Sequence, residues 1–302
     1  MKNSLTRILH GIVASLAFIV GSLGMNAINA STDDPKGEIV LTYVEWSSEV
    51  ASANVIKVVL EELHYQVDIV PVTAVFMWQA VASGDADGLV AAWLHTTHAH
   101  YMRAVKSKVE YLGPNLKGTK VGLVVPSYVS INSIKELNIN IDKFKGEIIG
   151  IDPGAGLMSK TEQAMKDYQL EDFKLVKGSG VTMTTKLENA IKNNQWIVVT
   201  GWTPHWKFSR WNLKYLKDDK GIFNPPKSNL NKKEEHIGTI VRLGLKKDMP
   251  EVYGVLDKFY WEPADMEKVM VWNSAENADP YENAKRWVNE NRDKVQKWIS
   301  PN

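Results

Sequence analysis

The stretch Glu38-Ile-Val-Leu-Thr-Tyr-Val-Glu-Trp46 reads as a short apolar strand that ends at a tryptophan, with an amphipathic helix directly after it. The helix is expected over 49–64, where apolar residues recur at helical spacing: Val50, Val55, Val58, Val59 and Leu63. The strand–helix order then repeats along the first half, with strands expected at 66–71, 88–92 and 120–126, and helices at 74–83 and 98–106. This alternation predicts an α/β protein with parallel-rich sheets flanked by helices.

The second half of the chain repeats the plan. Strands are expected at 147–151, 173–177 and 196–201, and helices at 157–168 and 181–193. A break is expected at Gly113-Pro114, and the polar, turn-forming residues of 217–235 predict a surface loop. Strand 237–243 would return the chain to the first half, and three helices would finish it, at 248–259, 263–273 and 280–299.

The two halves can be laid on each other. Trp46 and Trp93 are 47 positions apart, as are Ala155 and Trp202, and each half ends on a strand with a tryptophan. A chain of 302 residues is long enough for two domains. We therefore expect two lobes joined by a hinge of crossing strands, with lobe 1 over 31–120 and 241–302, and lobe 2 over 121–240.

The N-terminal segment 1–30 has the layout of a secretory signal peptide. Basic Lys2 and Arg7 precede an apolar run from Ile12 to Leu23, and small residues lead up to Ala30. Retention of this segment as an anchor is the alternative. The chain has no cysteine, so it has neither disulfides nor the residue that a lipid anchor needs. A soluble periplasmic protein, cleaved near Ala30, is expected.

The composition excludes several function classes. A formal net charge of +1 argues against binding nucleic acid through its phosphates. Cysteine is absent, and neither a Gly-x-Ser-x-Gly nor a His-Glu-x-x-His motif occurs, which argues against an enzyme. We expect a monomer without a cofactor.

Three of the eleven tryptophans follow strand-like runs, namely Trp46, Trp93 and Trp202. Open α/β sheets bind ligands at the carboxyl ends of their strands. Converging indole faces there would form an aromatic cage, the usual site for a quaternary ammonium ion. Core packing is the alternative. It is expected for Trp196, Trp261, Trp272, Trp287 and Trp298, and it stays equally open for Trp78, Trp206 and Trp211.

The turn Asp152-Pro-Gly-Ala-Gly-Leu157 opens a predicted helix, where backbone N–H groups can approach an anion. An ordinary tight turn remains the alternative. Histidines cluster at His95, His98 and His100, but no carboxylate lies nearby in sequence to support a metal. We therefore expect no metal site, and a hydrogen bond from His98 to a bound carboxylate.

Several motifs together resemble those of the glycine betaine-binding proteins that serve osmoprotectant ABC importers. The resemblance covers nearly all of 38–275. The motifs are Glu45-Trp-Ser-Ser-Glu49, Gly84-Asp-Ala-Asp87, Ala92-Trp-Leu-His-Thr-Thr-His98, Gly122-Leu-Val-Val-Pro126, Gly150-Ile-Asp-Pro-Gly-Ala-Gly156 and Val199-Thr-Gly-Trp-Thr-Pro-His-Trp206. Two features depart from the usual pattern. This chain places the Glu-Trp-Ser half first, whereas the family has either order, and His95 stands where relatives often have proline.

The resemblance implies a two-lobed periplasmic-binding-protein fold, a betaine ligand in the cleft, and a membrane permease as partner. The ammonium would sit in a box formed by Trp46, Trp93 and Trp202. The carboxylate would be held by the N–H groups of Gly156 and Leu157 and by His98. A receptor for another methylated onium compound is the alternative: proline betaine, carnitine, choline or dimethylsulfoniopropionate. An enzyme acting on such compounds would need a nucleophile or metal that the sequence does not offer.

Overall fold

The computed structural model describes residues 34–223 and 234–300. Within it, Pro35–Asn302 form one compact unit. The predicted signal peptide over 1–30 lies outside the described residues, as does part of the predicted loop over 217–235. In the part of the chain that is described, no helix is long and apolar enough to cross a bilayer.

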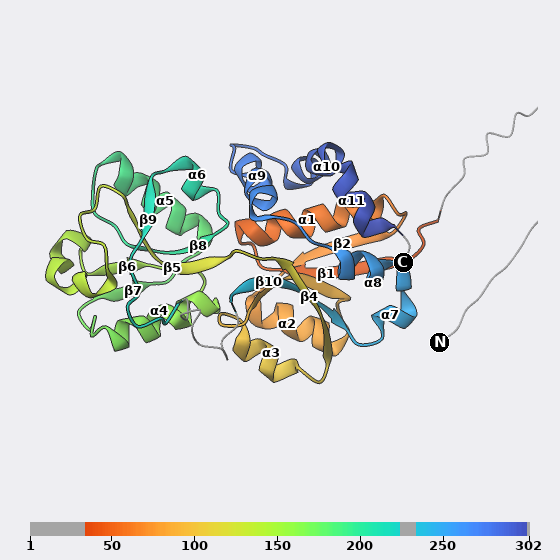
Figure 1. The fold of residues 1–302 in the computed structure, drawn as a ribbon, viewed down its shortest axis with the longest axis horizontal. Helices are drawn as coiled ribbons and strands as arrows, with labels where there is room; N and C mark the ends of the chain where they lie inside the picture. Colours follow the sequence, from red (N-terminus) through yellow and green to blue (C-terminus); the bar gives the residue numbers. More distant parts are fainter. Residues whose placement is uncertain (1–33, 224–233, 301–302) are drawn as a thin grey trace, which may run out of the picture. The chain divides into compact units, whose positions relative to one another are not determined.

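The first sheet has the strand order β2-β1-β3-β10-β4. Its strands are β1 (Glu38–Tyr43), β2 (Gln66–Pro71), β3 (Gly88–Leu94), β4 (Val109–Leu116) and β10 (His236–Arg242). Figure 1 shows one face covered by α1 (Ser47–Glu61), α9 (Pro263–Asn273), α10 (Pro280–Glu290) and α11 (Arg292–Ile299). The other face carries α2 (Ala74–Ser83) and α3 (Ala99–Val105), while the β4 side carries α7 (Leu245–Asp248) and α8 (Pro250–Lys258). We call this sheet and its helices the first lobe.

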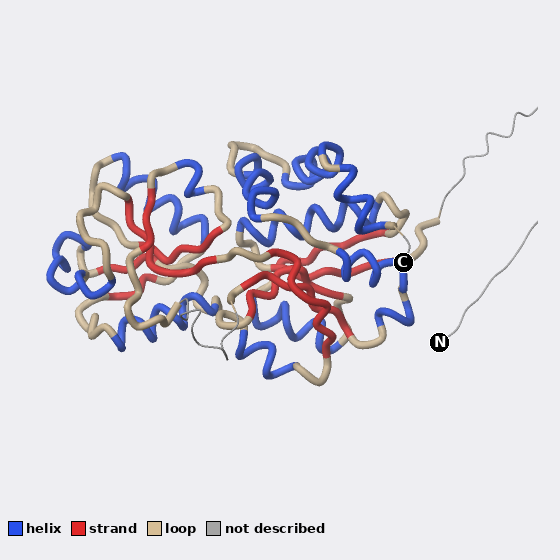
Figure 2. Tube along the Cα trace, viewed as in Figure 1, coloured by secondary structure: helices blue, strands red, loops and turns tan. Residues whose placement is uncertain are grey.

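The second sheet has the order β7-β6-β8-β5-β9. Its strands are β5 (Lys120–Pro126), β6 (Glu147–Ile149), β7 (Lys174–Val176), β8 (Val199–Thr203) and β9 (Leu213–Tyr215). The helices around it are α4 (Gly156–Asp167), α5 (Gly180–Lys192), α6 (Lys207–Arg210) and two 3-10 segments, η1 (Ile134–Glu136) and η2 (Asn138–Phe144). This sheet and its helices form the second lobe, and Figure 2 shows the strands gathered in two groups.

The two sheets share one pairing plan, which confirms the two-lobed α/β fold. In each, two pairings are parallel and two are antiparallel. In each sheet, the strand that makes both antiparallel pairings is the one that connects the lobes. Strand β5 follows β4 into the second sheet, and β10 returns to the first sheet after β9. The sheets are therefore mixed rather than parallel-rich. The predicted lobe boundaries and the hinge stay predictions.

Two local expectations were wrong, and one strand was not predicted. The predicted break at Gly113-Pro114 lies inside β4, which is the edge strand of its sheet. Proline has no N–H to donate, and an edge strand tolerates that loss. The strand β9 has three residues, too few for a period to show in the sequence. The helix expected over 280–299 is divided at Asn291 into α10 and α11.

The strand-end tryptophans also shift by a few positions. Tyr43 is the last residue of β1 and pairs with Pro71, the last residue of β2. Trp46 therefore lies beyond the strand and directly precedes α1. Trp93 and Trp202 each lie one residue before the end of their strands, β3 and β8. All three nevertheless stay near the carboxyl ends of strands, β1 and β3 in the first sheet and β8 in the second.

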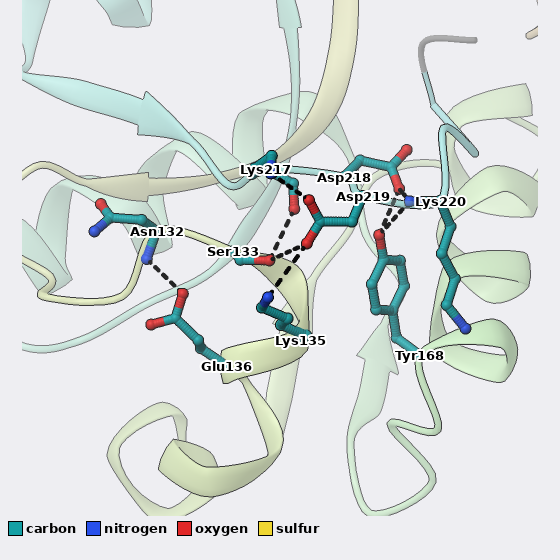
Figure 3. A network of polar contacts seen from close by, with 9 residues as sticks. All are labelled: Asn132, Ser133, Lys135, Glu136, Tyr168, Lys217, Asp218, Asp219 and Lys220. Carbon is teal, nitrogen blue, oxygen red and sulfur yellow. Dashed lines mark hydrogen bonds and ion pairs between the residues drawn. The ribbon is translucent and has the colours of Figure 1, made fainter. Parts of the chain in front are cut away.

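A polar network fastens the chain after β9 to the second lobe (Figure 3). Asp219 forms ion pairs with Lys217 and Lys135 and accepts a hydrogen bond from Ser133. Next to it, Tyr168 donates to Asp218 over 2.8 Å. Both lysines are mostly exposed, so each ion pair contributes little to stability, and the network mainly fixes the path of this segment.

Candidate functional site

One small cavity lies among residues from both lobes. All six residues predicted from the sequence line it: Trp46, Trp93, His98, Gly156, Leu157 and Trp202. Four further residues complete the wall, namely Thr97, Val121, Ile151 and Ala155. The structure thus brings together side chains that are more than 150 positions apart in sequence.

The aromatic walls come from both lobes. Trp46 and Trp93 belong to the first lobe, while Trp202 belongs to the second, and each is at most 6% exposed. Among the described residues, no two of these three rings stack on or tilt against each other. The space that the rings surround is therefore not filled by the rings themselves.

Each of the three indole N–H groups has a hydrogen-bond acceptor. Trp93 Nε1 donates to Glu49 Oε1 over 2.6 Å, and Trp46 Nε1 donates to Asp152 Oδ2 over 2.8 Å. Trp202 Nε1 donates to Ser48 Oγ over 3.3 Å. Two of these bonds join the lobes, because Asp152 follows β6 and Ser48 opens α1. The indole edges are thereby fixed, which leaves their faces to a ligand.

Glu49 is a site residue that the sequence analysis missed. It is 1% exposed, and its Oε2 accepts from Ser48 Oγ over 2.7 Å. Burial raises its pKa to about 7, against the opposing effect of the hydrogen bonds from Trp93 and Ser48. The sequence signal was present in Glu45-Trp-Ser-Ser-Glu49, but an acidic residue in the first turn of a helix has an ordinary explanation in the helix dipole.

The start of α4 also lines the cavity. Gly156 is its first residue, and the N–H groups of Gly156 and Leu157 have no acceptor in the part of the chain that is described. Such groups at a helix N-terminus favour an anion. A Cβ atom on Gly156 would lie 1.9 Å from the carbonyl oxygen of Thr97. Glycine is therefore required by the close approach of the two lobes.

His98 presents a hydrogen-bond donor to the same cavity. Its Nδ1 accepts from the Trp93 backbone N–H over 3.2 Å, so Nε2 carries the proton. That Nε2 is buried and has no hydrogen-bond partner among the described residues. Burial, with a smaller contribution from His100, lowers the pKa of His98 to about 3, which keeps the ring neutral at ordinary pH.

The loop that carries Thr97 is fastened by a residue that was predicted wrongly. Glu235 falls in the predicted surface loop, yet it is 7% exposed. Its carboxylate accepts from the Thr96 N–H and hydroxyl over 2.6 and 2.7 Å, and from the Thr97 N–H over 2.9 Å. Thr97 lines the cavity, and its buried hydroxyl has no hydrogen-bond partner among the residues that the structure describes. A single glutamate among polar loop residues carries no sequence signal for this role.

The side chains of the three clustered histidines lie in different surroundings. His95 packs against His236 with ring centroids 4.8 Å apart, and His100 packs on Tyr101 at 3.8 Å. His98 alone lines the cavity. Among residues 34–223 and 234–300, no group of three or more histidines and carboxylates could hold a metal ion.

The sequence matches the family described as the substrate-binding domain of the ABC-type glycine betaine transport system, over residues 37–290. The chain belongs to this family. Its members are transport binding proteins, which confirms the prediction that the chain is not an enzyme and makes it an extracytoplasmic substrate-binding protein.

Solved structures of this binding-protein family resemble the chain over most of its length. The lactococcal protein OpuAC, crystallised closed with glycine betaine, is 44% identical with a TM-score of 0.80, covering 87% of this chain and 100% of that one. The glycine betaine/L-proline-binding protein ProX of Borrelia burgdorferi is 41% identical with a TM-score of 0.82, covering 87% and 96%.

A curated relative matches over a shorter stretch. The glycine betaine/carnitine transport binding protein GbuC of Listeria monocytogenes is 46% identical over 153 residues. That alignment covers 50% of this chain and 48% of the relative, so the chain matches about half the length of that protein.

Proposed function

We propose that this chain captures glycine betaine outside the cytoplasm and delivers it to the membrane permease of an ABC importer. One observation carries the proposal. A single cavity is lined by three indoles, which we assign to the cation, and by the donors Gly156 N–H, Leu157 N–H and His98 Nε2, which lack acceptors among the described residues and which we assign to the carboxylate. That arrangement matches a small zwitterion with a methylated cation and a carboxylate.

The cation end uses only π faces. A trimethylammonium group cannot donate a hydrogen bond, so aromatic faces suit it better than a bare carboxylate does. Each desolvated cation–π contact contributes about 2 kcal/mol. Trp46, Trp93 and Trp202 are the three walls that we assign to this role.

The anion end selects against onium compounds that lack a carboxylate. Three buried donors would face the hydroxyl of choline, which accepts a weaker, uncharged hydrogen bond. A stranded buried donor costs about 1–3 kcal/mol. Glycine betaine is favoured over choline on this ground, while carnitine and proline betaine, which keep the carboxylate, differ only in the space that they need.

Each set of ligand-facing groups draws on both lobes, so binding one ligand holds the lobes together. Trp46–Asp152 and Trp202–Ser48 are hydrogen bonds across the cleft, and Tyr101 adds a third by donating to the Gly154 carbonyl over 2.7 Å. A closed monomer that presents both lobes to the permease is the form that we propose for delivery.

Binding of glycine betaine and choline to the protein and to His98→Ala tests this assignment. The parent protein is expected to bind choline at least about tenfold more weakly than glycine betaine. His98→Ala should weaken glycine betaine more than choline and so narrow the difference. His100→Ala, at an exposed histidine two residues on, is the matched control and should leave the difference unchanged. Equal affinity of the parent for both ligands would contradict the proposal.

A further inference from the structure

Behind the cage walls, one buried carboxylate is connected to an indole from each lobe. Glu49 accepts from Trp93 Nε1 through Oε1 and from Ser48 Oγ through Oε2. Ser48 Oγ in turn accepts from Trp202 Nε1. Neither Glu49 nor Ser48 lines the cavity, so both stand behind the walls rather than against the ligand.

This carboxylate has no cationic side chain as a partner among the described residues. Glu49 is in no ion pair, and the groups that contact it are an indole N–H, a hydroxyl and the first turn of α1. The helix N-terminus favours a negative charge there, but a buried ion without a counter-ion remains costly. A cation in the cavity, on the other side of the indoles, would supply the missing positive charge.

We propose that Glu49 is a positioning residue that, with Ser48, fixes one cage wall of each lobe and supplies the negative charge that an onium ligand neutralises. The inference rests on the proposed function. An indole whose N–H donates to a carboxylate has a more electron-rich ring, so the same hydrogen bond that orients Trp93 also strengthens its attraction for a cation.

The proposal predicts that ligand binding is coupled to a proton on Glu49. Burial raises the pKa of this carboxyl to about 7, and a cation nearby favours the ionised form and lowers that pKa. Below about pH 7 the free protein holds the proton and must release it on binding. Affinity therefore falls as the pH drops below about 7, and it is constant above that value.

The other titratable groups around the cage are distinguishable from Glu49. His98, after β3, stays neutral because burial lowers its pKa to about 3. After β8, burial also lowers the pKa values of His205 and Lys207. The remaining groups are carboxylates, Asp152 after β6 and Glu45 before α1. Because burial lowers the pKa of Lys207, its ammonium is a second candidate for release of a proton, and it is tested separately.

The experiment is calorimetric titration of the whole protein with glycine betaine at pH 6 and pH 8, in buffers of different ionisation enthalpy. The parent should release a proton on binding at pH 6 and bind about tenfold more tightly at pH 8. Glu49→Gln keeps an acceptor for Trp93 but lacks the charge. It should release no proton, bind equally at both pH values, and be about tenfold weaker than the parent at pH 8.

Two further variants separate the contributions. Ser48→Ala removes the connection to Trp202, so affinity should fall while proton release persists. Lys207→Met should also keep the proton release. The inference is overturned if Glu49→Gln releases as much proton as the parent, if Lys207→Met abolishes the release, or if the parent itself releases none. The last result decides the matter even where Glu49→Gln does not fold. A parent that binds no glycine betaine would instead refute the proposed function.

Discussion

Two tryptophan clusters in this protein are built in opposite ways. In the first lobe, the rings of Trp261, Trp287 and Trp298 pack on each other, with centroids 5.5 Å apart for the first pair and 5.9 Å for the second. The indole N–H groups of Trp261 and Trp287 are buried and have no hydrogen-bond partner in the described part of the chain. In the cage, the three rings do not pack on each other, and every indole N–H has an acceptor.

The two clusters show what fixes the orientation of an aromatic ring in each setting. In the core cluster, ring-to-ring packing sets the orientation, and an unpaired N–H is tolerated because the buried area outweighs its cost. In the cage the faces must stay free, so hydrogen bonds at the ring edges have to set the orientation instead. The core cluster also lies within one lobe, whereas the cage exists only when the two lobes meet.

The largest expected effect comes from exchanging a tryptophan for alanine in each cluster. Trp287→Ala should lower the free energy of unfolding by about 3–5 kcal/mol, because it leaves a large cavity in the core, with glycine betaine affinity kept in the folded fraction. Trp202→Ala should weaken glycine betaine binding about 30-fold, since a cation–π contact of about 2 kcal/mol is lost. Thermal unfolding measures the stability of both variants, and calorimetry measures their affinity for glycine betaine. If both variants lose stability and affinity to the same extent, the two clusters do not differ in function.

A smaller effect on binding should distinguish the cage, which both lobes build, from the core cluster, which lies within one lobe. Gly156→Ala would place a Cβ 1.9 Å from the Thr97 carbonyl, so the lobes could not approach fully. Overpacking of this kind costs about 1–3 kcal/mol, which corresponds to roughly tenfold weaker binding or more. Small-angle scattering with saturating ligand should show a larger radius than the parent. Gly154→Ala, where a Cβ meets only the Tyr101 hydroxyl at 3.8 Å, is the control. Full compaction of Gly156→Ala would speak against closure at this contact.

The smallest effect is expected at Lys207. This lysine lies beside the cage, and it shares one property with the core cluster, namely a buried side-chain nitrogen without a hydrogen-bond partner among the described residues. Its Nζ is buried 4.3 Å from the Trp202 ring centroid and has no hydrogen-bond partner within residues 34–223 and 234–300. Burial holds its pKa well below the usual value. The unfolded chain binds this proton more tightly, so stability should rise as the pH increases from neutrality towards about 10.

Lys207→Met should therefore raise the free energy of unfolding by about 1–3 kcal/mol at pH 7 and flatten that pH dependence. Lys220→Met, at an exposed lysine of the second lobe, serves as the control. Urea unfolding at pH 7 and pH 9 provides the comparison. A Lys207→Met protein less stable than the parent at both pH values would mean that the amine has a partner.

The sequence predicted the fold and the ligand-lining residues better than it predicted their supports. Strand and helix periods repeat in each half, so the two lobes could be anticipated, and tryptophans near strand ends converge because those ends share one edge of each sheet. Of the five tryptophans assigned to the core, Trp261, Trp287 and Trp298 are at most 3% exposed, whereas Trp196 and Trp272 are only partly buried. By contrast, the break expected at Gly113-Pro114 was wrong, because a sequence does not say which strand lies at an edge.

The supports were missed since they depend on contacts that no periodicity encodes. Glu49 reaches Trp93, 44 positions away, and Asp152 reaches Trp46, 106 positions away. Glu235 fastens the Thr97 loop from a segment that looks like surface. In each case one acidic residue meets an N–H from a distant element, and only the folded chain brings the two together.

The most direct test of the account is calorimetric titration of the parent protein at pH 8 with glycine betaine, dimethylglycine, sarcosine and glycine. The four ligands share the carboxylate and differ only in the methyl groups on nitrogen. A cage of indole faces predicts one site per chain and affinity that falls at each removal of a methyl group, because a less methylated ammonium is more strongly hydrated and needs hydrogen-bond acceptors that the faces do not offer. Equal affinity for glycine and glycine betaine, or no binding of glycine betaine, would contradict the cage.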